Sequence, residues 1–364
     1  MICLILADCY NYFVLKMFFT FLLIFTFFSL SSNLQVELKT PQLISPSPSL
    51  TTLPKPPSNH VISGGTHTFQ TFNNCGPAAL SMALSYYNIN VSQKTLGDQL
   101  RPWQNTVGDN DDKSVTLEEL AAKASDYELT PIHLPIGNEE IIKHFVSLDI
   151  PIITRTWLKV NDDIGHYRVI KGYDETGIIQ DDSLQGRNLF YTYKEFNDIW
   201  VKFNYEYLVL VPSNKLDRAK AIIGDSIDPK IAWNRAVELS NSQLAANPSD
   251  IAARFNLSVA LYNVGDYQGS IAAFEHVEQL LPFRTLWYQI EPILAYYELG
   301  MHDRVLSLTT KILNNQNRAF SELYVVRGKI FESRGDMNAA RQEYAQAIKY
   351  NSGFKDKLVR EQML

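Results

Sequence analysis

The pattern of hydrophobic and polar positions changes twice along the chain, and each change marks a different kind of segment. An almost unbroken apolar run extends from Phe13 to Leu30. Between about residues 64 and 211, helical periodicity comes first and strand-like segments follow it. From about residue 228 onward, only helical periodicity recurs. The pattern therefore predicts an apolar N-terminal segment, a mixed domain and a helical region.

The mixed segment has the pattern of an α+β domain. Thr116 is a suitable N-cap for one of its helices, because Glu118 and Glu119 follow in the first turn. The predicted antiparallel strands are rich in Ile, Val and Tyr and come after the helices, which is the α+β order. The expected helices span residues 75–87, 116–125 and 138–147, and the expected strands span residues 150–157, 167–173, 178–181 and 205–211.

The helical region repeats itself, because Gly265, Gly300 and Gly335 follow one another at intervals of 35 residues. Each unit is predicted to be two helices that meet at the glycine, with small residues where the helices touch. This resembles the tetratricopeptide repeat, whose period is about 34 residues. The middle unit departs from that pattern, since Pro292 falls in its first helix. An all-α tetratricopeptide-type solenoid is expected over residues 228–364, with a generic helical bundle as the alternative.

The start of the chain favours export. Lys16 supplies a positive flank to the apolar run, and from Met17 onward the run is shorter than the ~20 apolar residues that span a bilayer. Residues 1–32 are therefore interpreted as a signal peptide or an N-terminal membrane anchor. Residues 33–63 are rich in Pro, Ser and Thr and are expected to form an extended linker. The rest of the chain is expected to be extracytoplasmic, either secreted or anchored.

Composition narrows the class of protein. With 364 residues, 46% of them hydrophobic and 20% charged, the chain can bury the core of a globular protein. Its net charge of −6 is spread through the sequence with no run of Lys and Arg. Nucleic-acid binding and a polybasic membrane surface are therefore not indicated. Contact with a membrane is expected only through the N-terminal segment.

Cysteine usage singles out one thiol. Cys3 and Cys9 precede the apolar run, so removal of the N-terminal segment would leave only Cys75. No disulfide could then form within the mature protein. A solitary thiol in an oxidising compartment is expected to be buried or used.

The sequence around Cys75 suits a nucleophile. Asn73 or Asn74 can cap a helix, and Pro77 fits its first turn because its missing N–H would have no partner there. Cys75 would then lie at the positive end of the helix dipole, which stabilises the thiolate over the thiol. Gly76 allows other groups to approach the sulfur closely.

A thiolate also needs a base, and His166 has the best setting for one. It follows a glycine and opens an apolar strand, so that its ring can be held by a rigid element. Asp181 and Asp182 come a short turn later and could orient the imidazole. Gln70, five residues before Cys75, could donate its amide to an oxyanion.

The choice between the two aspartates depends on strand register. If Tyr173 pairs with Ile178, Asp181 shares the face of the sheet that carries His166. A shift of one residue places Asp182 there instead. The residues alone leave both carboxylates open.

Three motifs resemble the C39-like peptidase domain. They are Asn-Cys-Gly-Pro-Ala-Ala-Leu at residues 74–80, Gly-His-Tyr-Arg-Val-Ile-Lys-Gly-Tyr-Asp at 165–174 and Asp-Ser-Leu-Gln-Gly at 182–186. The resemblance implies a papain-like fold over residues 64–213. It implies Cys75 as the nucleophile, His166 as the base, Asp182 as the orienting acid and Gln70 as the oxyanion donor.

These observations predict an exported or anchored cysteine peptidase that acts on a peptide or protein substrate. The helical region would offer a groove for a protein partner or substrate. Two alternatives stay open, namely another papain-like acyl transfer, as in an amidase, and a non-catalytic peptide-binding scaffold. No cofactor or metal is expected, because the other histidines lack ligand spacing. The acidic stretch at residues 109–112 lacks the glycine and glutamate of a calcium loop.

Overall fold

The structure is a computed structural model that describes residues 53–101, 103, 115–315, 317–355 and 358. The signal or anchor segment, most of the expected linker and the acidic stretch at residues 109–112 lie outside the described residues. Within the described part of the chain, no helix has both the length and the apolar character needed to cross a membrane. From Leu53 onward the chain forms one compact unit.

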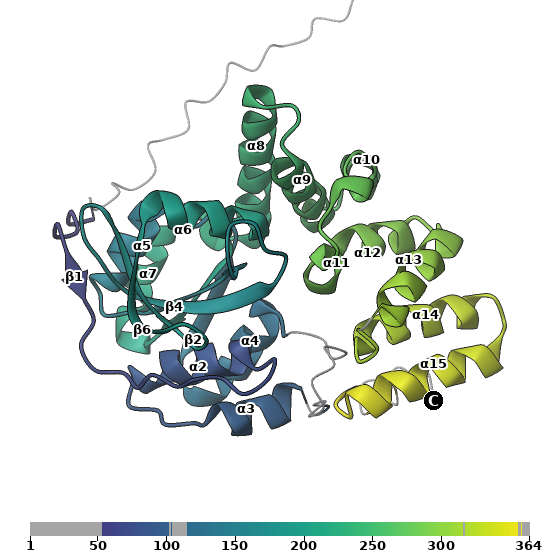
Figure 1. The fold of residues 1–364 in the computed structure, drawn as a ribbon, viewed down its shortest axis with the longest axis horizontal. Helices are drawn as coiled ribbons and strands as arrows, with labels where there is room; N and C mark the ends of the chain where they lie inside the picture. The colour runs from purple at the N-terminus through teal and green to yellow at the C-terminus, as the bar shows by residue number, and fades with distance from the viewer. Residues whose placement is uncertain (1–52, 102, 104–114, 316, 356–357, 359–364) are drawn as a thin grey trace, which may run out of the picture. The chain divides into compact units, whose positions relative to one another are not determined.

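An antiparallel sheet forms the centre of the first half of this unit (Figure 1). Its strand order is β2-β7-β3-β4-β5-β6, and the short strand β1 pairs with β4. The strands are β1 His60–Val61, β2 Thr130–Leu134, β3 Ile152–Trp157, β4 Gly165–Tyr173, β5 Gly177–Asp182, β6 Gly186–Thr192 and β7 Tyr207–Val211. All pairs are antiparallel, so the α+β prediction is confirmed.

Helices cover both faces of the sheet, and alternate strand residues point into two separate cores. Tyr167 and Val169 face the core shared with α2 and α4, whereas Ile170 and Tyr173 face the core shared with α5 and α6. The helices are α2 Cys75–Ser85, α3 Gln93–Leu100, α4 Leu117–Ala124, α5 Glu139–Val146, α6 Tyr193–Trp200 and α7 Leu216–Ile223. Short 3-10 helices are η1 Ser125–Tyr127, η2 Val201–Phe203, η3 Ser213–Lys215, η4 Gly224–Ile227 and η5 Glu278–Leu280.

The two helix starts that matter most for the site differ in how they are capped. At α4, the Thr116 hydroxyl accepts from the Glu119 N–H, and the Glu119 carboxylate accepts from the Thr116 N–H, a reciprocal capping box. At α2, Asn74 occupies the N-cap position but its side chain makes no capping bond. Its amide instead donates to the backbone and side-chain oxygens of Gln93, each at 3.1 Å. Of the two expected cap residues, Asn73 and Asn74, Asn74 thus takes the N-cap position, but the side-chain capping bond is absent.

A β-bulge in β4 decides which side chains share a face. Tyr173 pairs with Ile178 as the four-residue turn requires, but the register shifts between Ile170 and Gly172. Lys171 is the extra residue, and beyond it Arg168 pairs with Asp182. Because directly paired residues lie on one face, the bulge turns Asp182 toward the side of the sheet that carries His166.

The region after residue 228 is all-helical (Figure 1). Three of its helix pairs meet at the equally spaced glycines. Gly265, Gly300 and Gly335 have φ of 90°, 70° and 78°, a backbone conformation that favours glycine. The helices are α8 Pro229–Ala246, α9 Ile251–Val264, α10 Tyr267–Glu275, α11 Thr285–Tyr288, α12 Glu291–Glu298, α13 His302–Asn314, α14 Ser321–Ser333 and α15 Met337–Tyr350.

The middle pair differs from the other two in its first helix. Pro292 falls in the first helix of the middle pair, as the sequence predicts, and it lies in the first turn of α12. The chain before it forms the separate four-residue helix α11. Proline supplies no N–H to an earlier carbonyl, which explains why the helix starts anew at this point.

Candidate active site

Cys75 is the first residue of α2, and its side chain is buried with an exposed fraction of 6%. Its thiol is free, and the residue belongs to the first turn of the helix, where the backbone N–H groups have no intrahelical acceptor. Close packing explains why residue 76 is a glycine, because a Cβ there would come 2.2 Å from the Val115 side chain. The helix start is thus packed closely against the neighbouring segment around the thiol.

His166 connects Cys75 to Asp182. The His166 Nε2 atom lies 2.9 Å from Asp182 Oδ1, and both side chains are buried. The other ring nitrogen, Nδ1, is left for the hydrogen bond between His166 and the Cys75 thiol. The structure therefore brings these three side chains into one chain of hydrogen bonds.

Asp182 is itself held firmly. Its Oδ1 atom also accepts from the backbone N–H groups of Leu184 at 2.7 Å and Gln185 at 2.9 Å. Its Oδ2 atom lies 3.2 Å from Nε of the buried Arg168. Both oxygens are thus engaged, and the carboxylate cannot rotate without losing several charged contacts.

Asp181 lies on the opposite face, away from His166. Its carboxylate pairs with Lys171 Nζ at 2.7 Å and accepts from the Tyr86 hydroxyl at 3.1 Å and the Asn188 N–H at 3.0 Å. Lys171 is the bulged residue, so one irregularity in β4 both moves Asp181 away from His166 and supplies its partner.

The surroundings of the thiol favour its ionised form. Burial alone would raise the pKa of Cys75, but the hydrogen bond and charge of His166, the charge of Arg101 and the Tyr167 N–H together lower it below its usual value. The pKa of His166 is raised although burial opposes its charge, because Asp182 and Cys75 both favour the imidazolium. Both shifts favour a thiolate–imidazolium pair.

The charged groups of Asp182 and Arg101 interact with this pair. Burial opposes ionisation of Asp182, but His166, Arg168 and the Gln185 N–H outweigh it and lower the pKa of Asp182 to about 2. Burial lowers the pKa of Arg101 to about 10, while Cys75 and Glu119 favour its charged form. Both groups are ionised at neutral pH, so their charges are constant in the range where Cys75 would react.

Gln70 lies on the segment that leads into α2, and two contacts orient it. The Ser183 hydroxyl donates to Gln70 Oε1 at 2.7 Å, and the Gln70 N–H donates to the Ser183 carbonyl at 2.9 Å. With its oxygen engaged by Ser183, the Gln70 side chain retains its NH₂ group as a donor. Ser183 follows Asp182 directly, so Gln70 is tied to the strand end that carries the carboxylate.

Gln93 fixes the segment from Thr68 to Asn74, a role the sequence did not suggest. Its NH₂ group donates to the Phe69 carbonyl at 2.5 Å, and its oxygen accepts from the Thr71 N–H at 2.9 Å and from Asn74. Arg168 and Ser183 were likewise not recognised. Arg168 could have been found, because a charged residue two positions after His166 in an apolar strand shares its face.

Comparison with known proteins gives one family match. Residues 60–208 match the model of the family described as Peptidase_C39 like. This match supports a C39-like peptidase domain. Within the described residues, no group of three His, Cys, Asp or Glu side chains is arranged to hold a metal ion. No curated protein matches the chain.

Several solved structures are similar to part of this chain. A structure from Bacillus anthracis described as a C39-like peptidase has 18% identity and a TM-score of 0.35. A double-glycine-motif protease from an AMS/PCAT transporter, solved with a leader peptide, has 19% identity and a TM-score of 0.33. The peptidase domain of Streptococcus ComA, a bifunctional ABC transporter, has 17% identity and a TM-score of 0.34. The matches cover 43%, 43% and 41% of this chain and 98% of each solved chain.

Proposed function

We propose that this protein is an exported or membrane-anchored cysteine peptidase that hydrolyses peptide bonds through Cys75, His166 and Asp182. The observation that carries the proposal is the unbroken hydrogen-bonded series from the thiol at the start of α2 through His166 to Asp182. The C39-like family match over residues 60–208 supports the same class of activity. Export and a role for the helical region in binding a protein partner or substrate are parts of this proposal that rest on the sequence.

In the first step, the Cys75 thiolate attacks the carbonyl carbon of the scissile bond and the carbonyl π electrons move to oxygen. The Gln70 NH₂ group and the Cys75 backbone N–H, which has no intrahelical acceptor, are the donors proposed for this oxyanion. His166 then gives its proton to the leaving nitrogen as the C–N bond breaks, which leaves a thioester on Cys75.

In the second step, water attacks the thioester carbonyl while His166 takes one of its protons. The C–S bond breaks, the carboxylic acid product leaves, and the thiolate–imidazolium pair is restored. Asp182 keeps Nε2 of His166 protonated throughout, so that Nδ1 is the nitrogen that exchanges the proton.

The pH dependence of Cys75 alkylation tests the pairing of thiol and imidazole. In the wild type, iodoacetamide should react with Cys75 well below the pH at which an ordinary thiol ionises, because His166 stabilises the thiolate. In His166→Ala the rate should rise only at more alkaline pH. Identical profiles in the two proteins would falsify the proposed pair and favour a non-catalytic scaffold.

Hydrolysis itself provides the second test, with the two adjacent aspartates as a matched pair. Cys75→Ala should abolish cleavage of a peptide substrate, and Asp182→Asn should lower kcat because it weakens the bond that orients His166. Asp181→Asn should lower kcat less, because Asp181 contacts Lys171 on the other face. Mass spectrometry of the products separates hydrolysis from acyl transfer.

A further inference from the structure

A cavity of about 570 Å³ lies where the C39-like domain meets the helical region, and we call it the junction cavity. One wall is the β3–β4 loop, from Trp157 to Asp163, together with Lys202 and Phe203. The other wall consists of the start of α9 and the segment 280–289. Its volume falls in the range of ligand-binding sites, about 300–1,000 Å³.

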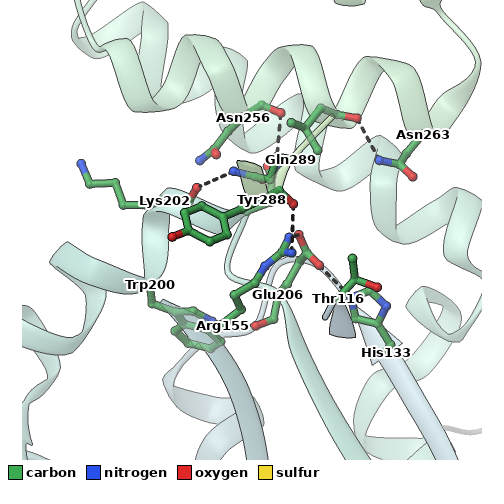
Figure 2. Close-up of polar contacts among 12 residues, drawn as sticks. Thr116, His133, Arg155, Trp200, Lys202, Glu206, Asn256, Asn263, Tyr288 and Gln289 are labelled. Carbon is green, nitrogen blue, oxygen red and sulfur yellow. Dashed lines mark hydrogen bonds and ion pairs between the residues drawn. The ribbon is translucent and has the colours of Figure 1, made fainter. Parts of the chain in front are cut away.

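The two walls are joined by specific polar contacts (Figure 2). Figure 2 shows Gln289 reaching toward Lys202, whose carbonyl accepts from its Nε2 atom at 3.2 Å. Arg155 reaches out of the sheet to donate to the Tyr288 carbonyl, also at 3.2 Å. Asn256 of α9 donates to the Val201 carbonyl at 2.6 Å. Arg284 also forms an ion pair with Asp163, with 2.6 Å between Nη1 and Oδ1. These contacts hold the two walls of the cavity together.

Tyr288 connects the junction cavity to the candidate active site. Its ring lies against Gly165, where a Cβ would come within 2.9 Å of it. Gly165 directly precedes His166 and pairs with Trp157. Trp157 lines the cavity, so one cavity wall includes a residue of the strand pair that carries the proposed base. Burial raises the pKa of Tyr288 to about 12 against the effect of the Gly165 hydrogen bond, and the Cys75 charge adds to the rise.

The lining has the chemistry of a site for apolar groups with a few points of polar recognition. Apolar and aromatic side chains dominate, among them Phe203, Phe255, Leu281 and Phe283. Two lining residues carry buried polar atoms that have no hydrogen-bond partner among the described residues, Oε1 of Gln289 and Oγ1 of Thr285. These residues are 2% and 6% exposed. A buried polar atom without a partner is costly, so each is suited to a polar group of a bound molecule.

We propose that the junction cavity binds an extended apolar stretch of the polypeptide that is cleaved at Cys75. Apolar side chains of the substrate would fill the cavity, while its backbone N–H groups would donate to Gln289 and Thr285. The helical region then forms one wall of the substrate-binding cleft. The inference rests on the proposed peptidase activity, because its occupant is the polypeptide that Cys75 would cleave.

Synthetic random-sequence peptides, analysed by mass spectrometry after digestion, reveal the preference directly. The wild type should enrich apolar residues at a fixed distance from the cleaved bond. Cleavage without such a preference overturns the inference and leaves the peptidase activity intact. Absence of any cleavage by the wild type contradicts the proposed function, and the inference falls with it.

Two substitutions test whether the preference arises in this cavity. Leu280 lines it and is 61% exposed, so Leu280→Asp adds a charge there without disturbing a core. Ala252→Trp fills part of the space. Each should lower kcat/KM for the preferred peptide by about tenfold or more, the usual scale for one large apolar contact. The matched control is Leu299→Asp, which is also exposed but lies outside the cavity and should leave kcat/KM unchanged.

Replacement of the preferred apolar residues of the peptide by polar ones completes the test. If the cavity binds the apolar residues, the replacement should lower kcat/KM for the wild type but have little further effect on Leu280→Asp, because both changes remove the same contact. Alkylation of Cys75 should remain as in the wild type in both cavity variants. The inference is overturned if the enzyme substitution and the peptide substitution lower kcat/KM independently, so that their effects multiply. It is also overturned if Leu280→Asp has the same kcat/KM as Leu299→Asp.

Discussion

A half-buried glutamate at the junction gives a sharp prediction for stability. Glu291 is the first residue of α12, and its Oε2 atom is buried with no hydrogen-bond partner among the described residues. Burial, with smaller contributions from the nearby Glu206 and Glu118, raises the pKa of Glu291 from its ordinary 4.5 to about 7, although Arg155 and a backbone N–H oppose the shift. The folded protein therefore holds this proton at pH values where the unfolded chain has lost it.

The sign and size of the effect follow from that difference. Because the folded state binds the extra proton, the free energy of unfolding falls as the pH rises from about 4.5 to about 7 and then levels off. Each unit of difference between the pKa of Glu291 in the folded and in the unfolded protein is worth about 1.4 kcal/mol. The full cost of the ionised carboxylate in the folded protein is therefore about 3 kcal/mol. Glu291→Gln removes the charge while keeping the shape, and should therefore remove this cost.

The measurement compares urea unfolding of the wild type and Glu291→Gln at several pH values. Relative to the wild type, the variant should gain about 2–3 kcal/mol in unfolding free energy between about pH 5 and pH 8. Tryptophan fluorescence and far-ultraviolet circular dichroism should give the same difference, which checks that the transition is cooperative. Glu298→Gln, an exposed change on the same helix, is the control and should follow the wild type at every pH. Parallel curves for the wild type and Glu291→Gln would refute the reasoning.

Two other predictions concern the oxyanion donor and the helical region. Gln70→Ala should lower kcat for peptide hydrolysis by about a hundredfold with little change in KM, because the donor acts on the oxyanion of the intermediate; an unchanged kcat contradicts that role. Gly328→Ala should lower the unfolding free energy by about 1–3 kcal/mol, because the new Cβ would come 2.2 Å from the buried Tyr344 ring. Urea unfolding measures it, and an unchanged or raised midpoint would show that helix propensity outweighs the overlap.

The parts of the fold that depend on local pattern could be predicted. The capping box at Thr116 and the turns at the three equally spaced glycines follow from residue types at short spacing. β2 and β6 were missed because both are edge strands whose exposed positions break the apolar pattern, and β2 contains Pro131. The eight-residue helix α3 was missed for a different reason, because it buries only Leu96 and Gly97 and so offers little apolar pattern.

The candidate site depends on features that the local sequence pattern does not predict. Which aspartate meets His166 depends on the bulge at Lys171, and no feature of the strand sequence marks that residue as the extra one. The contact of Asn74 with Gln93 joins a loop to a helix that the periodicity did not reveal. Tyr288 is separated from Gly165 by more than a hundred residues, so only the tertiary structure can bring it to the site.

The irregular middle unit of the helical region is also the part that reaches the candidate site. Pro292 prevents one continuous helix, and the short helix α11 before it presents the Tyr288 and Gln289 contacts to the sheet domain. A regular unit would continue its first helix through these positions and would keep their backbone groups in intrahelical bonds. The Tyr288 carbonyl is instead available to Arg155, because the helix ends there. The departure from the repeat pattern therefore has a structural consequence, since it frees the backbone and side-chain groups that join the helical region to the strand pair carrying His166.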